Sequence, residues 1–439
     1  MNYSITKKTV FLLLALFLAP RLIYWGLYVL FPEQINIDHL NHHWAAASGL
    51  LKTGMLTTDS GEPTSFIEPL YPLFLEGLRL LTGDRLELII LFQILFSIVG
   101  FMYFFKLCRL LFKRDRTIFI AMIIYAFYPY LIRCSIKLME VSFFRVLLTG
   151  AAYHSLKASK SLAQSAAAGF LWGLSILTRS MIFPAFIMIV LKLFWDKKIR
   201  SAFLVLFLGV GISTPMFIYN HKIDGSWFPT RGGLNFFVGN NPYYGRLMPM
   251  YHVDNLESYA YRVLAKERPD LVNASDRLKD QFFYQKSFEF IRKNPIQFLK
   301  YKVLNLTYFF MPAVIPMRSL GDTSVMVQDD GSIRLDMTAS NFPARGGFSI
   351  FLHAASKSFV MVFALFGLWF RRKKLLSEDF SLVSIIVTFI SVYTVVWPSS
   401  RLYAPAIFVL MFYSAFGFER LIPVLKHLSD HLSDNDLPG

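Results

Sequence analysis

The chain has 439 residues, of which 55% are hydrophobic and 17% are charged, and its formal net charge is +16. Soluble domains are about 25% charged, so this composition leaves too little polar surface for a soluble enzyme. Two cysteines exclude a disulfide scaffold, and the paired spacing of zinc knuckles is absent. The basic surplus fits nucleic acid, anionic lipid or membrane topology, and only its distribution along the chain decides between them.

Apolar runs of membrane-spanning length dominate the sequence. The first, residues 9–31, is apolar except for Arg21 and has no signal-peptide cleavage site, so we interpret it as a retained span. Further runs follow at residues 86–112, 117–132, 139–156, 162–177, 180–195, 202–219, 348–370, 380–397 and 402–418. The sequence therefore predicts an all-α polytopic membrane protein with about ten transmembrane helices.

Lysines and arginines are concentrated in the short segments that these spans would place in the cytoplasm. They are Lys7, Lys8, Lys106, Arg109, Lys113, Arg114, Arg116, Lys157, Lys160, Lys192, Lys197, Lys198, Arg200 and residues 371–374. The pattern predicts that both termini are cytoplasmic. It also indicates that the surplus of basic residues interacts with the lipid bilayer and not with nucleic acid. Two more apolar stretches, 69–81 and 295–311, would invert the later basic loops if they crossed. We therefore expect both to lie flat on the outer face.

This topology divides the chain into three parts. Residues 1–219 form an N-terminal transmembrane module that includes a first outer loop at 32–85. Residues 220–347 form an outer domain of mixed charge, which fits an outside location because long translocated segments escape the positive-inside rule. Residues 348–439 form the C-terminal transmembrane helices and a cytoplasmic tail.

Asp38 lies just beyond the first span, at the start of an amphipathic helical pattern. It fits an N-cap, and it also fits a general base at the membrane surface. His39, His42 and His43 follow at helical spacing, which can present two imidazoles to one metal ion. Because no second ligand cluster is present, we expect solvated or interfacial histidines, and a divalent metal ion at His42 and His39 is the alternative.

Arg21 breaks the first span near its middle, where an arginine costs at least a few kcal/mol unless it faces a polar partner. A salt bridge to Glu140 and the binding of a lipid phosphate are both open. Glu140, Glu68, Arg179 and Arg401 collect with Asp38 at the outer rim of the predicted topology. A mixed set of charges beside an intramembrane arginine indicates an anionic ligand.

The outer domain opens with paired glycines, aromatic residues and amides over residues 225–242. Aromatic and amide side chains stack on sugars and form hydrogen bonds with them, although a packed loop would have the same composition. Arg231, Asn235 and Asn240 are the candidate substrate contacts in this segment.

These pieces, in this order and on this side, resemble the C-type-fold membrane glycosyltransferases, in the bacterial family related to protein O-mannosyltransferases and the lipid A aminoarabinose transferase. The resemblance extends from Arg21 to Leu410. It is carried by Asp38 after an arginine-containing span, by Met139-Glu140 opening a span, and by four further segments. These are residues 66–75 (FIEPLYPLFL), 169–179 (GFLWGLSILTR), 232–242 and 401–405 (RLYAP).

The resemblance implies an inverting transfer of a hexose or pentose from a polyprenyl-phosphate donor to a surface glycan, lipid or protein. It implies a bacterial inner membrane, a periplasmic active site and an undecaprenyl carrier, with lipopolysaccharide among the acceptors. Asp38 matches the catalytic base, and Glu140 matches a second acidic position. The basic positions at Arg179 and Arg401 match a phosphate site. We add Arg21, Glu68, Arg231, Asn235 and Asn240 to the substrate-binding set. Two departures are His39, where some relatives have a second acid, and Glu68, where a lysine is often found.

Two other functions stay open. An O-antigen polymerase or ligase would depend on Arg231 and His252 more than on Asp38. A transporter or flippase for lipid-linked sugars fits the number of spans, but no internal repeat stands out, and helices broken at the midplane are not evident apart from a faint signal at Pro184 and Pro215.

Overall fold

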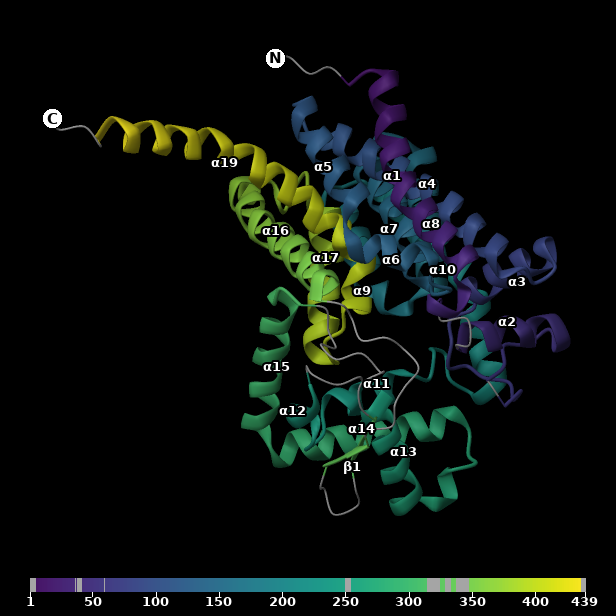
Figure 1. The fold of residues 1–439 in the computed structure, drawn as a ribbon. Coiled ribbons are helices and arrows are strands. Elements are labelled where there is room, and N and C mark those ends of the chain that lie inside the picture. Colours follow the sequence, from purple (N-terminus) through teal and green to yellow (C-terminus); the bar gives the residue numbers. More distant parts are fainter. Residues whose placement is uncertain are drawn as a thin grey trace.

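The computed structural model describes residues 5–35, 37, 42–58, 60–248, 254–313, 324–327, 333–336 and 347–435. The helices form an elongated bundle with a second group of helices below it (Figure 1). Helix α1 begins and helix α19 ends at the upper end of the bundle, while α11 to α14 lie beyond its lower end. The start of α1 and the end of α19 therefore share one side, and the location of both termini in the cytoplasm stays a prediction.

Each of the ten apolar runs is occupied by helix. The N-terminal part holds α1 (Lys7–Leu30), α4 (Leu86–Leu111), α5 (Asp115–Phe127), α6 (Pro129–Ile136), α7 (Glu140–Lys157), α8 (Leu162–Thr178), α9 (Phe183–Trp195) and α10 (Ile199–Asp224). The C-terminal part holds α16 (Gly347–Arg371), α17 (Phe380–Val395), α18 (Ser400–Tyr403) and α19 (Ile407–Asn435). Short 3₁₀ turns occur at Pro32–Gln34, Ala158–Lys160, Ser180–Ile182, Pro269–Leu271, Arg372–Lys374 and Ala404–Ala406.

By length and composition, 5 helices of the described chain can cross a membrane singly, and α5 with α6, bent by 50°, makes a possible sixth. Three shorter apolar helices cover Leu162–Thr178, Ser180–Trp195 and Phe380–Val395. The bend follows from Pro129, which cannot donate a helical hydrogen bond. The all-α membrane fold is confirmed, and the number of about ten spans stays a prediction.

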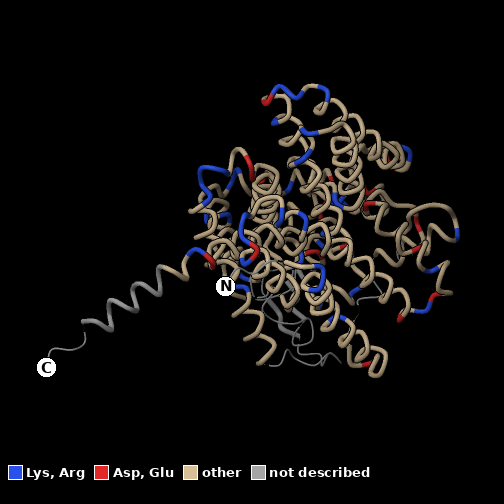
Figure 2. The backbone as a smooth tube through the Cα atoms, turned by 90° about the horizontal axis from the view of Figure 1, so that it is seen from above, with Lys and Arg blue, Asp and Glu red and all other residues tan. Residues whose placement is uncertain are grey.

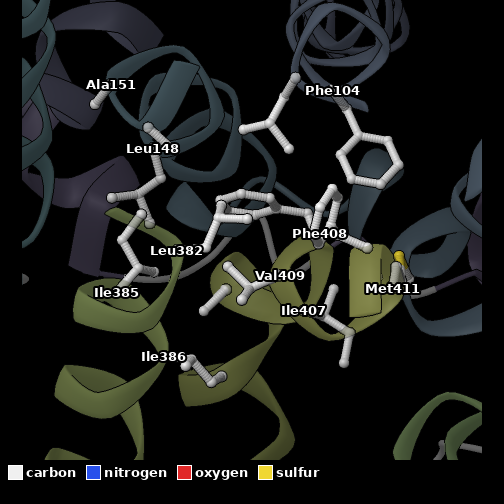
Figure 3. Close-up of a cluster of buried hydrophobic side chains, with 14 of the residues drawn as sticks. Phe104, Leu148, Ala151, Leu382, Ile385, Ile386, Ile407, Phe408, Val409 and Met411 are labelled. Carbon is white, nitrogen blue, oxygen red and sulfur yellow. The ribbon is translucent and has the colours of Figure 1, made fainter. Parts of the chain in front are cut away.

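The N-terminal and C-terminal helices share one hydrophobic core. Phe104 of α4, Leu148 of α7, Leu382 of α17 and Phe408 of α19 converge in this core (Figure 3). Helices α16 and α19 approach each other closely at Gly367, which has no side chain to separate them. A Cβ at this position would lie 1.9 Å from a backbone oxygen of α19. The described helices of the N-terminal and C-terminal parts therefore contribute to a single bundle.

The helices of the outer region pack around a second core. They are α11 (Gly232–Gly239), α12 (Tyr244–Leu247), α13 (Asp254–Glu267), α14 (Asp276–Lys293) and α15 (Pro295–Phe310). Leu234, Phe283 and Tyr301 are buried in this core. Two short strands, β1 (Ser324–Val327) and β2 (Ile333–Asp336), pair antiparallel.

The first outer loop supplies α2 (His42–Thr53) and α3 (Leu70–Thr82), which lie near the lower end of the bundle (Figure 1). Helices α3 and α15 occupy the two stretches that we expect to lie flat on the outer face, and that orientation stays a prediction. Figure 2 shows charged residues mainly in loops and at helix ends, with mostly uncharged helices between them.

Candidate active site

Glu140 is the centre of the candidate site. An extended Met139 starts α7 at Glu140, and a carboxylate in the first turn suits the positive end of the helix dipole. The residue is buried, yet three basic groups from three other elements surround it. Its Oε2 accepts hydrogen bonds from His43 Nε2 at 2.8 Å and Arg401 Nη2 at 3.0 Å, and its Oε1 pairs with Arg179. Glu140, Arg179 and Arg401 therefore meet, although they are far apart in the sequence.

Arg179 and Arg401 lie at the ends of helices, and part of each side chain is exposed to solvent. Arg179 is the C-cap residue of α8 and has an extended backbone conformation. Arg401 lies two residues after Ser399, whose hydroxyl accepts a hydrogen bond from the Arg401 backbone N–H. Their side chains are 20% and 29% exposed, whereas that of Glu140 is 1% exposed. Among the described residues, Arg179 and Arg401 share the single carboxylate of Glu140. The arrangement can therefore hold an oxyanion on the exposed side of both arginines.

Two histidines at the start of α2 complete the site. His43 is buried against Glu140, and the His42 and His43 rings lie 4.4 Å apart. Burial lowers the pKa of His43 despite the neighbouring Glu140 carboxylate, and burial together with His43 lowers the pKa of His42 well below its ordinary value. Both imidazoles are therefore neutral at pH 7. A neutral His43 can donate its Nε2–H to Glu140 without adding charge.

Asp38 and His39 lie outside the described residues. Ile37 precedes this gap and His43 comes shortly after it, and both make contacts close to Glu140. Leu138, two residues before Glu140, donates its backbone N–H to the Ile37 carbonyl at 2.9 Å, and His43 contacts Glu140 directly. Among the described residues, no group of three or more His, Cys, Asp or Glu is arranged to hold a metal ion.

Glu68 lies at the edge of this site. Its Oε1 accepts hydrogen bonds from the backbone N–H of Ser180 at 3.0 Å and from the Ser180 hydroxyl at 2.9 Å. Ser180 directly follows Arg179, so Glu68 fixes the turn that carries this arginine. In the described structure Glu68 serves as a capping carboxylate for the turn.

Arg21 does not pair with Glu140, so the suggested salt bridge is wrong. Its Nη1 donates to the carbonyls of Phe17 and Ala126, the latter at 2.9 Å, and its guanidinium lies 3.7 Å from the centre of the Phe17 ring. The Ala126 carbonyl is exposed to this contact because α5 ends before Pro129. Arg21 therefore caps the broken end of α5 deep in the bundle.

The three outer-domain candidates have different environments. Arg231 pairs with Glu257 at 3.1 Å and lies over the Phe66 ring, and Asn235 accepts from Trp397 Nε1 at 3.4 Å. Asn240 is 0% exposed, and its amide donates to the Phe236 and Val395 carbonyls. Asn240 therefore attaches the outer domain to α17 and is closed to a sugar.

Sequence reasoning missed two residues near this site. His43 enters the sequence analysis only through the histidine spacing, which carries no signal of its burial against Glu140. Arg145 was not considered, although it is a charged residue inside a predicted span, five positions after Glu140. Both cysteines, Cys108 and Cys134, are free and buried.

Residues 63–219 match the family described as dolichyl-phosphate-mannose-protein mannosyltransferase. The match confirms the resemblance found in the sequence. The matched segment contains Glu68, Glu140 and Arg179, and it ends before the outer domain. Curated proteins offer no match to the sequence.

Three solved structures show how this chain compares with larger enzymes. The oligosaccharyltransferase AglB from Archaeoglobus fulgidus, in complex with an inhibitory peptide and a dolichol-phosphate, is 12% identical over 99% of this chain and 53% of its own, with a TM-score of 0.48. The oligosaccharyltransferase of the same organism tethered with an acceptor peptide is 13% identical over 96% of this chain and 51% of its own, with a TM-score of 0.49. ArnT from Cupriavidus metallidurans bound to undecaprenyl phosphate is 12% identical over 93% of this chain and 78% of its own, with a TM-score of 0.41. The chain spans about half the length of the oligosaccharyltransferases.

Proposed function

We propose that this protein is an inverting glycosyltransferase that moves a sugar from a polyprenyl-phosphate carrier to an acceptor at the outer face of a membrane. The observation that carries the proposal is the contact of Arg179 and Arg401 with one buried carboxylate, Glu140. The family match over residues 63–219 supports the same class of donor, because its description names a dolichyl-phosphate sugar.

The two arginines suit the leaving group of this reaction. As the bond between sugar and phosphate breaks, negative charge grows on the phosphate oxygens, and donors aimed at that charge stabilise the transition state. Glu140 holds both guanidinium groups in place before the donor binds, so little ordering remains to be done when it arrives. We therefore assign Glu140 to the positioning of the arginines.

Asp38 is the proposed general base. A carboxyl group with an ordinary pKa near 4 is ionised at neutral pH and can accept the proton of an acceptor hydroxyl or amine. The acceptor oxygen or nitrogen forms its bond to the anomeric carbon while the bond to the phosphate oxygen breaks, which inverts the anomeric configuration. The contacts of Ile37 and His43 beside Glu140 support this assignment, since they bracket the segment that contains Asp38.

The biological setting is part of the proposal. We infer a bacterial inner membrane, an undecaprenyl carrier and an active site on the periplasmic side, with a surface glycan, a lipid such as lipopolysaccharide, or a protein as acceptor. The basic residues of the short loops support this orientation, because they would lie in the cytoplasm opposite the site.

The test is a transfer assay with purified protein in liposomes that contain a radiolabelled polyprenyl-phosphate sugar. We expect a new glycosidic bond with wild-type protein, no transfer with Asp38→Asn, and unimpaired transfer with Glu62→Gln, which alters an exposed acid of the same loop. Movement of the labelled lipid across the bilayer without a new glycosidic bond would contradict the proposal and indicate a transporter.

A further inference from the structure

Arg145 is a buried cation for which the described protein offers no acceptor. It lies on α7, its side chain is 0% exposed, and its Nε, Nη1 and Nη2 atoms have no hydrogen-bond partner. Its guanidinium lies 5.3 Å from the centre of the Tyr125 ring. An arginine inside a membrane bundle without an anion is costly, and such residues normally pair or face a polar ligand.

Arg21 adds a second cation to the same place. Its Nη1 reaches two carbonyls, but its Nε and Nη2 atoms are buried without a partner. Arg145 is close enough to act electrostatically on Arg21, and the rings beside the two arginines, Phe17 and Tyr125, stack with centres 5.8 Å apart. The Tyr125 hydroxyl is also buried without a partner. Five guanidinium nitrogens and one hydroxyl are therefore left without an acceptor.

Nearby carboxylates do not balance these charges. Glu140, five residues before Arg145 on α7, already binds Arg179 and Arg401. No ion pair of Arg21 or Arg145 with a carboxylate is present among the residues that the structure describes. Two like charges in a low-dielectric interior repel each other, so an anion between them would be held strongly.

We propose that Arg145 and Arg21 form a second oxyanion site, deeper in the helix bundle than the Glu140 cluster, that takes the phosphate group of a membrane lipid. The guanidinium fork suits a phosphate, which can accept several N–H bonds at once. A lipid can reach this depth beside α1, because Leu22 and Ile23 next to Arg21 are 37% and 64% exposed. This inference does not depend on glycosyl transfer at Glu140.

The experiment counts radiolabelled farnesyl phosphate bound per chain of delipidated protein in detergent. We expect two molecules per wild-type chain, one per Arg145→Met chain, and two per Arg109→Met chain, which removes an exposed arginine at the far end of α4. Arg145→Lys, which keeps the charge, should bind more than Arg145→Met. Size-exclusion chromatography shows whether each variant is folded and monodisperse.

Two additional arms identify the source of the phosphate. Farnesol should not bind in place of farnesyl phosphate, because it lacks the oxyanion. Competition by inorganic phosphate at the Arg145-dependent site would identify free phosphate as the ligand, and resistance to it would identify the lipid. Equal binding per chain by wild-type protein and monodisperse Arg145→Met would overturn the second site, whether or not the Glu140 cluster binds a molecule of its own.

Discussion

Glu140 shows how one buried carboxylate can organise a site from distant parts of the chain. Its partners come from α2, α8 and α18, and it is far less exposed than the two arginines it binds. Burying a lone carboxylate is unfavourable, but paired guanidinium groups and hydrogen bonds offset that cost. The residue therefore stabilises this end of the bundle and orients the two arginines together.

Replacement of Glu140 by Gln should weaken both stability and donor binding. Removing one member of a buried ion cluster leaves uncompensated charge, and partial exposure of the arginines reduces the expected loss to about 2–3 kcal/mol. We expect a lower Tm and at least a tenfold higher Kd for a prenyl-phosphate sugar, measured by thermal unfolding and equilibrium binding.

Glu419→Gln is the matched control for this variant. Glu419 is also buried and pairs with Arg114 at 2.6 Å, but at the opposite end of the bundle. It should lower Tm without changing the donor Kd. A wild-type Kd in Glu140→Gln would contradict the positioning role of Glu140.

The outer domain is attached to the bundle by backbone-level contacts at the end of α17. A Cβ at Gly239 would lie 1.5 Å from the Val396 carbonyl oxygen, so α11 and α17 meet without room for a side chain. Lys302 of α15 donates to the Val395 carbonyl at 2.7 Å, and burial lowers its pKa to about 7. This junction lies five residues before Arg401 and sets the position of the loop that carries it.

Gly239→Ala should disrupt this junction. The methyl group meets backbone, which cannot move aside as a flexible side chain does, and overpacking of this kind costs about 1–3 kcal/mol. We expect a lower Tm and reduced transfer in the liposome assay. Gly211→Ala on α10, where a Cβ meets nothing within 4 Å, is the control and should leave both unchanged. Equal Tm values for the two variants would show that α11 docks in another way.

We expect Asp280 of α14 to make the folding stability of the outer domain depend on pH. Burial raises its pKa to about 6 even though it accepts a backbone hydrogen bond from Gly233 at 2.6 Å. The folded protein therefore holds this proton more tightly than the unfolded chain, so stability falls as the pH rises from about 4 through 6. Asp280→Asn should raise stability by about 1–2 kcal/mol at pH 8 and by less at pH 5. Thermal unfolding at the two pH values measures this, and an equal gain at both would contradict it.

The sequence predicted elements better than it predicted contacts. The ten apolar runs became helices because composition and length determine such segments locally. Contacts such as Arg21 with Ala126 depend on where α5 breaks and which helix lies beside it, and neither is readable from spacing. The convergence of Glu140, Arg179 and Arg401 could be anticipated from their common topological side, but the burial of Asn240 could not, because it depends on the packing of α11 against α17.

At the scale of the whole molecule, the two ends of the bundle differ in the charged groups that they carry. The start of α1 and the end of α19 lie at one end of the bundle, and α2, which carries His43 of the candidate site, lies near the other (Figure 1). Short basic loops at the first end would orient the protein in a membrane, and the ion cluster at the second end would meet the phosphate of a lipid carrier. We therefore expect the net charge of +16 to serve orientation in the membrane more than ligand binding.

Cysteine labelling tests this orientation directly. The native Cys108 and Cys134 are 0% and 6% exposed, so their background should be low. A membrane-impermeant thiol reagent applied to intact cells should label Lys293→Cys, at the end of α14, but not Lys197→Cys, in the loop after α9. Permeabilised cells should show labelling of both. Labelling of Lys197→Cys in intact cells would invert the topology and remove the proposed outer site.

The most direct test of the proposed mechanism is the steady-state transfer rate as a function of donor concentration, measured in parallel for two variants. Asp38→Asn should lower kcat by about 100-fold or more while leaving the donor KM within about twofold, since a general base acts on the acceptor. Arg401→Met should raise the donor KM by about tenfold or more, since it removes a phosphate ligand. Retained kcat in Asp38→Asn together with an unchanged donor KM in Arg401→Met would contradict the account.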